Sequence, residues 1–330
     1  MRILIPGGSG QIGTSLAGHL HANGHEVTIL SRNPQPPQNP WRTLHWDGLT
    51  KGPWVSEIDR SDAVIHLSGR SVNCRYNEEN RREIYDSRQK PTLLLGEVIA
   101  ASPTPPRIWM NASTSTFYRN SFDEPQDEFT GILGDLPCQR GMHEPANQPE
   151  TWSFSINVAY RWEQALAAIP TPHTRKIRLR SSMTMSPNPG GVFSVFSKLA
   201  KLGLGGTQGP GTQYVSWIHD LDSCRIVDLL LEHPEIADET GGVVNVTAPE
   251  PLPNREFMRA LRKAWGQPIG IPAASWMLEA GALFMRTETE LILKSRRAVP
   301  TLLLKHGFQF AFPTWPEAAQ DLVARMKSAS

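Results

Sequence analysis

The chain has few of the residues that mark disulfide-rich or metal-binding proteins. Its 330 residues include only 3 cysteines, Cys74, Cys138 and Cys224, and no two of them stand at a Cys-x-x-Cys spacing. Scattered cysteines of this kind favour buried or idle thiols in a reducing compartment over disulfides, a metal site or a catalytic thiol. We therefore expect a cytoplasmic protein without a metal site.

Long hydrophobic runs are also missing. No stretch approaches the roughly 18 continuous apolar residues that a membrane helix needs. The apolar run at residues 3–5 is interrupted almost at once by Gly7, Gly8 and Ser9, which is unlike the core of a signal peptide. We expect neither a membrane span nor a signal peptide.

Neither sign of charge is in large excess. The formal net charge is +1, which is too small to create the positive field by which proteins hold nucleic acids or anionic membranes. The expected partner is therefore a small-molecule substrate rather than a nucleic acid or a membrane.

The sequence does contain a regular alternation of strand and helix patterns. A buried strand at 2–6, a helical repeat of Ile12, Leu16 and Leu20, and a strand at 26–30 form one βαβ unit. The alternation then continues with a strand at 62–67, a helix at 78–101, a strand at 107–111, a helix at 152–169 and a strand at 176–180. It predicts an α/β fold with a Rossmann-type doubly wound parallel sheet.

The character of the chain changes after residue 186, where glycine-rich loops separate mixed helix and strand signals. We interpret residues 1–186 as an NADP(H)-binding Rossmann domain and 187–330 mainly as a smaller C-terminal substrate-side domain. The boundary is soft, because a strand at 243–246 is expected to return to the main sheet.

A glycine-rich turn joins the first strand to the first helix. Gly7, Gly10 and Gly13 have GxxGxxG spacing, and Gly8, Gly10 and Gly13 have GxGxxG spacing. Glycines here allow a tight turn and let the backbone approach a pyrophosphate, which the free N–H groups of the helix N-terminus attract. The strand–turn–helix context favours dinucleotide binding over a merely structural turn.

The end of the second strand indicates which dinucleotide. NAD sites usually carry an acidic residue about 20 residues after the glycines, whereas this chain has Ser31-Arg32-Asn33. An arginine can pair with a 2′-phosphate through charge-assisted hydrogen bonds. The sequence therefore favours NADP(H), with a solvated surface arginine as the alternative.

The longer segments that follow resemble the extended short-chain dehydrogenase/reductases. The likeness is greatest to their atypical branch of epimerase family proteins, which are nucleoside-diphosphate-sugar epimerase-like and end in a domain of unassigned role. The matching segments lie at 7–13, 31–34, 45–47, 62–69, 84–88, 162–163, 202–206, 216–220 and 245–251.

The resemblance implies further cofactor contacts. The cofactor-binding residues it suggests, together with the turn and the second strand, are Gly7, Gly8, Ser9, Gly10, Gln11, Ile12, Gly13, Ser31, Arg32, Asp47, Leu67, Ser68 and Gly69. Arg88, on the helix at 78–101, is a further candidate because it could reach a phosphate or a carboxylate, with an exposed or paired arginine as the alternative. Asp47 would lie near the adenine, and Leu67 to Gly69 would line the cofactor. The resemblance also implies pairing of two copies through the helices at 78–101 and 152–169.

The usual catalytic pair of the superfamily is missing. That pair is a tyrosine with a lysine four residues later, which lowers the tyrosine pKa, and none of the 5 tyrosines has a lysine at that position. If Glu163 matches the glutamate that usually follows the pair, Ser155 and Ala159 stand in place of the tyrosine and the lysine.

Substitute residues are available for the chemistry. Ser113 and Tyr118 are candidate catalytic residues, and His219 is a candidate substrate contact, with packing or structural roles as the alternatives for each. The basic cluster Lys294, Arg296 and Arg297 is interpreted as a solvated helix face.

The sequence thus leads to two expectations about function. The first is an NADP(H)-dependent oxidoreductase or epimerase-like enzyme acting on a small carbonyl or hydroxyl substrate, with a nucleotide sugar as one candidate. The second is a catalytically silent NADP(H)-binding protein that senses redox state.

Overall fold

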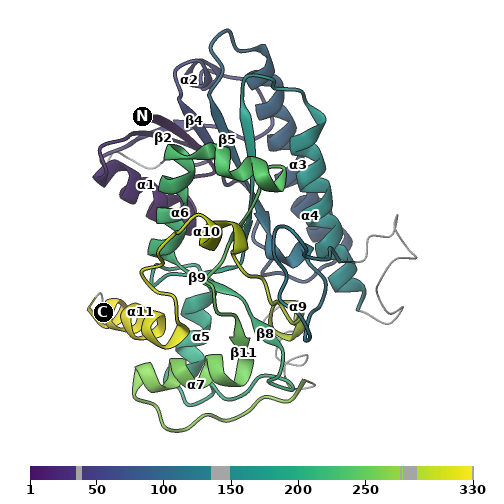
Figure 1. The fold of residues 1–330 in the computed structure, drawn as a ribbon, viewed down its shortest axis with the longest axis vertical. Coiled ribbons are helices and arrows are strands. Elements are labelled where there is room, and N and C mark those ends of the chain that lie inside the picture. Colours follow the sequence, from purple (N-terminus) through teal and green to yellow (C-terminus); the bar gives the residue numbers. More distant parts are fainter. Residues whose placement is uncertain (35–38, 135–148, 276, 278–287, 329–330) are drawn as a thin grey trace.

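A parallel sheet forms the centre of the molecule (Figure 1). The structure is a computed structural model that describes residues 1–34, 39–134, 149–275, 277 and 288–328. Within these residues the sheet has 7 strands in the order β10-β6-β5-β4-β1-β2-β3. Their bounds are β1 (Arg2–Pro6), β2 (Glu26–Ser31), β3 (Arg42–His45), β4 (Ala63–His66), β5 (Ile108–Thr114), β6 (Arg175–Ser181) and β10 (Val243–Val246).

The strand order reverses direction between β1 and β4. From β1 the chain runs outward through β2 and β3, and it then returns to β4 on the other side of β1, from which β5, β6 and β10 follow outward. All of these strand pairs are parallel. In such sheets ligands bind outside the carboxyl ends of the strands at the point of reversal, which here is formed by the loops after β1 and β4.

Helices cover both faces of the sheet. The helices α1 (Gln11–Ala22) and α6 (Asp220–Glu232) pack on one face, and α2 (Val55–Ile58), α3 (Glu78–Ala101) and α4 (Glu150–Ala168) pack on the other. Successive strand residues point to opposite faces: Ile3 and Ile5 share a core cluster with α1 and α6, whereas Leu4 belongs to the cluster of α2 and α3. The expected doubly wound α/β fold is confirmed.

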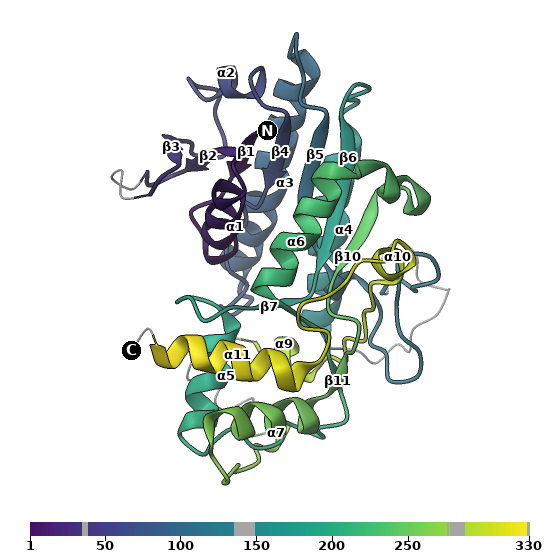
Figure 2. The same ribbon diagram turned by 60° about the vertical axis from the view of Figure 1, so that its left-hand side comes forward.

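The remaining elements form a lobe at the carboxyl end of the sheet (Figure 2). Its helices are α5 (Val192–Lys201), α7 (Asn254–Trp265), α9 (Glu290–Leu293) and α11 (Trp315–Ser328), whereas α10 (Thr301–Lys305) packs against β10 of the main sheet. Its short strands pair as β7 (Met183–Met185) with β9 (Trp217–His219), and as β8 (Tyr214–Val215) with β11 (Leu252–Pro253). The 3-10 helices η1 (Ser115–Phe117) and η3 (Pro234–Thr240) lie nearer the sheet.

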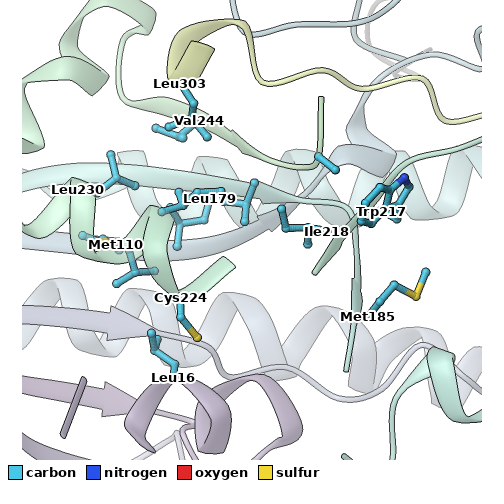
Figure 3. Packing of buried hydrophobic residues seen from close by; sticks show 14 of the residues in the cluster. Leu16, Met110, Leu179, Met185, Trp217, Ile218, Cys224, Leu230, Val244 and Leu303 are labelled. Atoms are coloured by element: carbon cyan, nitrogen blue, oxygen red, sulfur yellow. The ribbon is translucent and has the colours of Figure 1, made fainter. Parts of the chain in front are cut away.

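One apolar core runs from the sheet into this lobe. Leu16, Leu179, Trp217 and Leu303 belong to the same buried cluster (Figure 3). At its far end the Trp315 ring stacks on Phe257, with ring centroids 4.0 Å apart. The cluster holds the C-terminal elements against the sheet and so positions whatever they contribute to a site.

The sequence predictions can be compared with these elements. The helix at 78–101 has the predicted bounds, and the strand at 243–246 does return to the sheet by pairing with β6. The edge strand β3 was not predicted from the sequence, because its half-exposed residues carry no apolar alternation. The division at residue 186 stays a prediction.

Two of the three cysteines lie within the described residues. Cys74 is half-buried and Cys224 is buried, both as free thiols, and Cys138 lies outside the described residues. None of the helices that the structure describes is both long enough and apolar enough to cross a membrane.

Two neighbouring leucines of α10 test how tightly this element is packed. Leu303 is fully buried and Leu304 is 49% exposed. We expect Leu303→Ala to lower the free energy of unfolding by about 2–5 kcal/mol, because it leaves a cavity in the core. Leu304→Ala should change it by no more than about 0.5 kcal/mol. Urea denaturation measures both, and equal losses would show that α10 is not anchored through Leu303.

Candidate functional site

The turn after β1 requires glycine for reasons of space. Gly7 has a φ of +79°, and a Cβ there would lie 2.6 Å from the backbone nitrogen of Ser68. A Cβ on Gly8 would come within 2.9 Å of Ile29, and one on Gly13 within 2.5 Å of the Gly8 Cα. These contacts bring the turn against β2, the loop after β4, and the first turn of α1.

Gly10 differs from the other glycines of the turn because a side chain at this position would not collide with any neighbouring protein atom. The nearest atom to a Cβ on Gly10 is 3.9 Å away. Gly10 is the N-cap of α1, no side chain caps this helix, and its first turn has no acidic residue. The free N–H groups and the partial positive charge of the helix end therefore have no negative partner from the described protein.

A cavity of about 500 Å³ opens at this edge of the sheet. Eight of the predicted cofactor-binding residues line it: Gly7, Gly10, Gln11, Ile12, Gly13, Leu67, Gly69 and Arg88. Gly8, Ser9, Ser31, Arg32, Asp47 and Ser68 are not part of its lining. Size and mixed lining are typical of small-molecule sites.

Ser9 and Ser31 connect the turn to the end of β2. The Ser31 hydroxyl donates to the Ser9 hydroxyl at 2.8 Å. The next residue, Arg32, is exposed and makes no ion pair or hydrogen bond with any residue that the structure describes. Arg32, which has no partner among the described residues, thus directly follows the residue that joins β2 to the turn.

Asp47 lies past the end of β3, and its carboxylate is hydrogen-bonded to the residues that follow it in sequence. Its carboxylate accepts hydrogen bonds from the backbone N–H groups of Leu49 and Thr50, each at 2.8 Å, and from the Thr50 hydroxyl. These bonds lower the pKa of Asp47.

Arg88 on α3 lines the cavity without a carboxylate partner among the described residues. Its guanidinium donates to the carbonyl oxygens of Ile84 and Arg70 at 3.0 and 3.1 Å and lies over the Trp162 ring. Burial lowers the pKa of Arg88 to about 10, which is still high enough to keep the group charged at neutral pH.

Ser113, near the end of β5, reaches the cavity but also serves a buried ion pair. Its hydroxyl donates to Glu163 Oε1 at 2.7 Å. Arg180 of β6 holds both oxygens of Glu163, at 2.8 and 2.9 Å. The three groups, which we call the Ser113–Glu163–Arg180 triad, tie β5, α4 and β6 together.

Tyr118 lies beside this triad and away from the cavity lining. Its side chain is only 3% exposed, and its hydroxyl donates to Asn245 Oδ1 at 2.9 Å. The Arg180 guanidinium lies over its ring. Burial raises the pKa of Tyr118 to about 12, so its phenol keeps its proton near neutral pH.

His219 is not brought to the cavity either. It is buried, its Nδ1 accepts the backbone N–H of Leu221 at the start of α6, and its Nε2 lies 3.0 Å from Asp321 of α11. The ring stacks on Phe312. Burial lowers the pKa of His219. In this arrangement His219 caps α6 and connects it to the C-terminal helix.

The interpretation of Lys294 and Arg296 as part of a solvated face is wrong. Both side chains are buried, at 1% and 6% exposure, because Lys294 donates to the Thr116 carbonyl and Arg296 pairs with Glu290 at 3.0 Å. Arg296 also donates to the Thr116 hydroxyl. Arg297 donates to the Asp123 carbonyl oxygen.

Glu290 in turn accepts a hydrogen bond from the Ser155 hydroxyl of α4. Ser155, Glu290 and Arg296 all line the cavity, and we call them the Ser155–Glu290–Arg296 triad. Counting back from Glu163 marks Ser155 in the sequence. No local signal marks Glu290 or Arg296, because Glu290 is separated from Ser155 by 135 positions.

With the geometry described, the chain can be compared with known proteins. The model of the NAD dependent epimerase/dehydratase family matches residues 3–137, and a domain of unknown function, DUF1731, matches residues 273–322. Epimerase family protein SDR39U1 of Bos taurus is 32% identical over 98% of this chain and 100% of its own.

Two solved structures have a similar fold. Human epimerase family protein SDR39U1 (isoform 2) with NADPH is 30% identical, with a TM-score of 0.79 and coverage of 98% of this chain and 99% of that chain. The nucleoside-diphosphate sugar epimerase from Corynebacterium glutamicum is 25% identical, with a TM-score of 0.73, and covers 99% of this chain and 61% of that chain.

The buried pair of Glu163 and Arg180 should matter greatly for stability. We expect Arg180→Met to lower the free energy of unfolding by about 3–5 kcal/mol, because it removes the cation that bonds both oxygens of the buried Glu163 and leaves only Arg178, whose guanidinium is 3.8 Å away. The control is Arg175→Met, which removes an equally well-formed but exposed pair with Asp238 and should cost about 0–1 kcal/mol. Urea denaturation at pH 7 measures both. Similar losses would contradict the importance given to burial.

Proposed function

This chain belongs to the NAD dependent epimerase/dehydratase family, and on that premise we propose that it binds NADP(H) at the carboxyl edge of its main sheet. The observation that carries the proposal is the turn after β1. Gly7, Gly8 and Gly13 are closed against the protein, whereas Gly10 opens toward free space at an uncapped helix N-terminus. Such a cradle fits a pyrophosphate.

The choice of NADP(H) over NAD(H) is supported by the end of β2. Ser31 is followed in sequence by Arg32 and Asn33 and not by an acidic residue that would repel a 2′-phosphate, and Arg32 is exposed and unpaired among the described residues. A guanidinium that is not engaged elsewhere can form charge-assisted hydrogen bonds to a phosphate. The human relative crystallised with NADPH gives the same indication.

For the reaction, we propose an NADP(H)-dependent oxidoreductase or epimerase-like enzyme that acts on a small carbonyl or hydroxyl substrate. When bound, the cofactor supplies or accepts a hydride. The chain itself would hold the substrate at Ser113 and Arg88, while the apolar side chains of Leu67, Phe154 and Val158 limit water in the cavity. A nucleotide sugar is one candidate substrate, in line with the Corynebacterium glutamicum epimerase.

A second candidate function is a catalytically silent NADP(H)-binding sensor of redox state. It is favoured by the missing tyrosine–lysine pair, and by Tyr118, which does not line the cavity and whose pKa is raised by burial to about 12. NADPH consumption by the purified protein against a broad carbonyl panel separates the two. Substrate-dependent consumption supports the enzyme, whereas binding without consumption favours the sensor.

The resemblance also supports two finer proposals. Two copies would pair through α3 and α4, which lie side by side in one copy (Figure 1). The protein would be located in the cytoplasm.

Arg32 tests the choice of cofactor. We expect Arg32→Ala to weaken NADPH binding by at least about tenfold, since a hydrogen bond to a charged group contributes about 1.5–3 kcal/mol. NADH binding should be unchanged, because NADH has no 2′-phosphate. Fluorescence titration measures both affinities. The control is Arg107→Ala, an exposed arginine just before β5, at the opposite edge of the sheet. Equal losses for NADPH and NADH in Arg32→Ala would contradict the assignment.

Gly10 tests the position of the pyrophosphate. Gly10→Val should keep the fold and lower the free energy of unfolding by only about 0.5–1 kcal/mol, because valine is a poorer N-cap than glycine but the Gly10 backbone is extended and a Cβ there has no neighbour nearer than 3.9 Å. The new side chain would fill the space against the turn and weaken NADPH binding by at least about tenfold, or 1.4 kcal/mol. Urea denaturation and NADPH titration on the same samples check both points. Unchanged affinity in the folded variant would remove the pyrophosphate from the turn.

A further inference from the structure

Two serines that line the cavity share an unusual arrangement. Ser113 donates its hydroxyl proton to Glu163, and Ser155 donates its proton to Glu290. The two carboxylates come from different parts of the chain, α4 and α9. Both serines reach the cavity, and both have a carboxylate behind them.

Each carboxylate is held by a buried arginine. Arg180 bonds both oxygens of Glu163, and Arg296 lies 3.0 Å from Glu290 Oε1. All four charged side chains are at most 8% exposed. A carboxylate paired in this way is an acceptor only. The single hydroxyl proton of each serine is therefore committed to the carboxylate behind it.

The polarity that these groups present to a ligand follows from their protons. A hydroxyl group has one donor and two acceptor lone pairs, and here the donor points away from the cavity. What Ser113 and Ser155 offer to a ligand is therefore lone pairs. A ligand hydroxyl can donate to them, whereas a carbonyl oxygen has no proton and would meet lone pairs with lone pairs.

We propose that the cavity recognises its substrate through hydroxyl groups that donate to Ser113 and Ser155, so that the alcohol form binds more tightly than the carbonyl form. The inference rests on the proposed function and selects the hydroxyl member of its substrate class. It also gives the C-terminal domain a role in the site, because Glu290 and Arg296 lie within the 273–322 match to a domain of unknown function and set the direction of the Ser155 hydroxyl.

A matched pair of small rings tests the proposal. 1,4-Cyclohexanediol and 1,4-cyclohexanedione have the same carbon skeleton and differ in donors. Ligand-observed NMR titrations use protein without cofactor, and also NADPH-loaded protein for the diol and NADP⁺-loaded protein for the dione, so that no hydride can be transferred. We expect the diol to bind at least about tenfold more tightly, equivalent to 1.4 kcal/mol.

Variants of one residue on α4 locate the effect. Ser155→Ala should weaken diol binding by about fivefold or more and leave dione binding unchanged, about 1 kcal/mol for one lost hydrogen bond. The control is Ser153→Ala, which makes the same chemical change on the same helix but at a position outside the cavity lining. Diol binding should be unaffected in the control.

Glu290→Gln tests the direction of the proton. Its amide can donate to Ser155 and free the hydroxyl proton for the cavity, so the preference for the diol should fall and dione binding should rise. Because this variant also leaves Arg296 without its charge partner, folding is checked by circular dichroism, and Ser155→Ala decides the matter if Glu290→Gln does not fold.

The outcomes separate this inference from the proposed function. Dione binding as tight as diol binding, no binding of either ring, or equal effects of Ser155→Ala and Ser153→Ala would overturn the inference. NADPH titration of the same samples is read separately. Intact NADPH binding with no diol preference leaves the cofactor site standing, whereas loss of NADPH binding in the wild type removes the proposed function itself.

Discussion

Two carboxylates lie buried beside the cavity, and a buried carboxylate is tolerated only where a cation and hydrogen-bond donors surround it. Glu163 meets this condition with Arg180 and Ser113, and Glu290 meets it with Arg296 and Ser155. The first triad joins α4 to two strands of the sheet, and the second joins α4 to the C-terminal lobe. The positions of both cavity serines, and the direction of their protons, thus follow from where these two charges are neutralised.

At the same end of the sheet, the turn after β1 is subject to a steric constraint, because it packs too closely against its neighbours to accommodate side chains. The absent side chains of Gly7, Gly8 and Gly13 let the turn approach the loop after β4 and α1 more closely than any Cβ would allow. Because β1 and β4 are neighbours at which the strand order reverses, the two loops open the cavity between them. The glycine turn and the two serines, Ser113 and Ser155, therefore line the same cavity, although a steric constraint positions the turn and buried ion pairs position the serines.

The parts of this arrangement that depend on neighbouring residues could be predicted from the sequence. Helix 78–101, the first βαβ unit and the glycine turn all carry local patterns, and the structure contains each of them. Glu290 and Arg296 carry none: in sequence they are an acid and a base near other charges, and only the fold brings them to Ser155, 135 positions away from Glu290. The local charge pattern therefore predicts a solvated Arg296, whereas the side chain is only 6% exposed. Tertiary packing decides which charges pair over such separations in sequence, and the hydrophobic periodicity of the sequence carries no information about it.

The missing tyrosine–lysine pair and the direction of the serine protons both bear on which group can exchange a proton with a bound substrate. A group exchanges protons efficiently when its pKa lies near the working pH, and Tyr118, with a pKa of about 12 and a hydroxyl bonded to Asn245, is poorly suited to this. Ser155, at the position expected for the tyrosine, is instead bonded to a carboxylate. The hydroxyl of Ser155 therefore faces a bound alcohol with lone pairs, because its own proton is given to Glu290. The C-terminal segment therefore determines the polarity of this part of the cavity wall, because Glu290 accepts the Ser155 proton and both residues line the cavity.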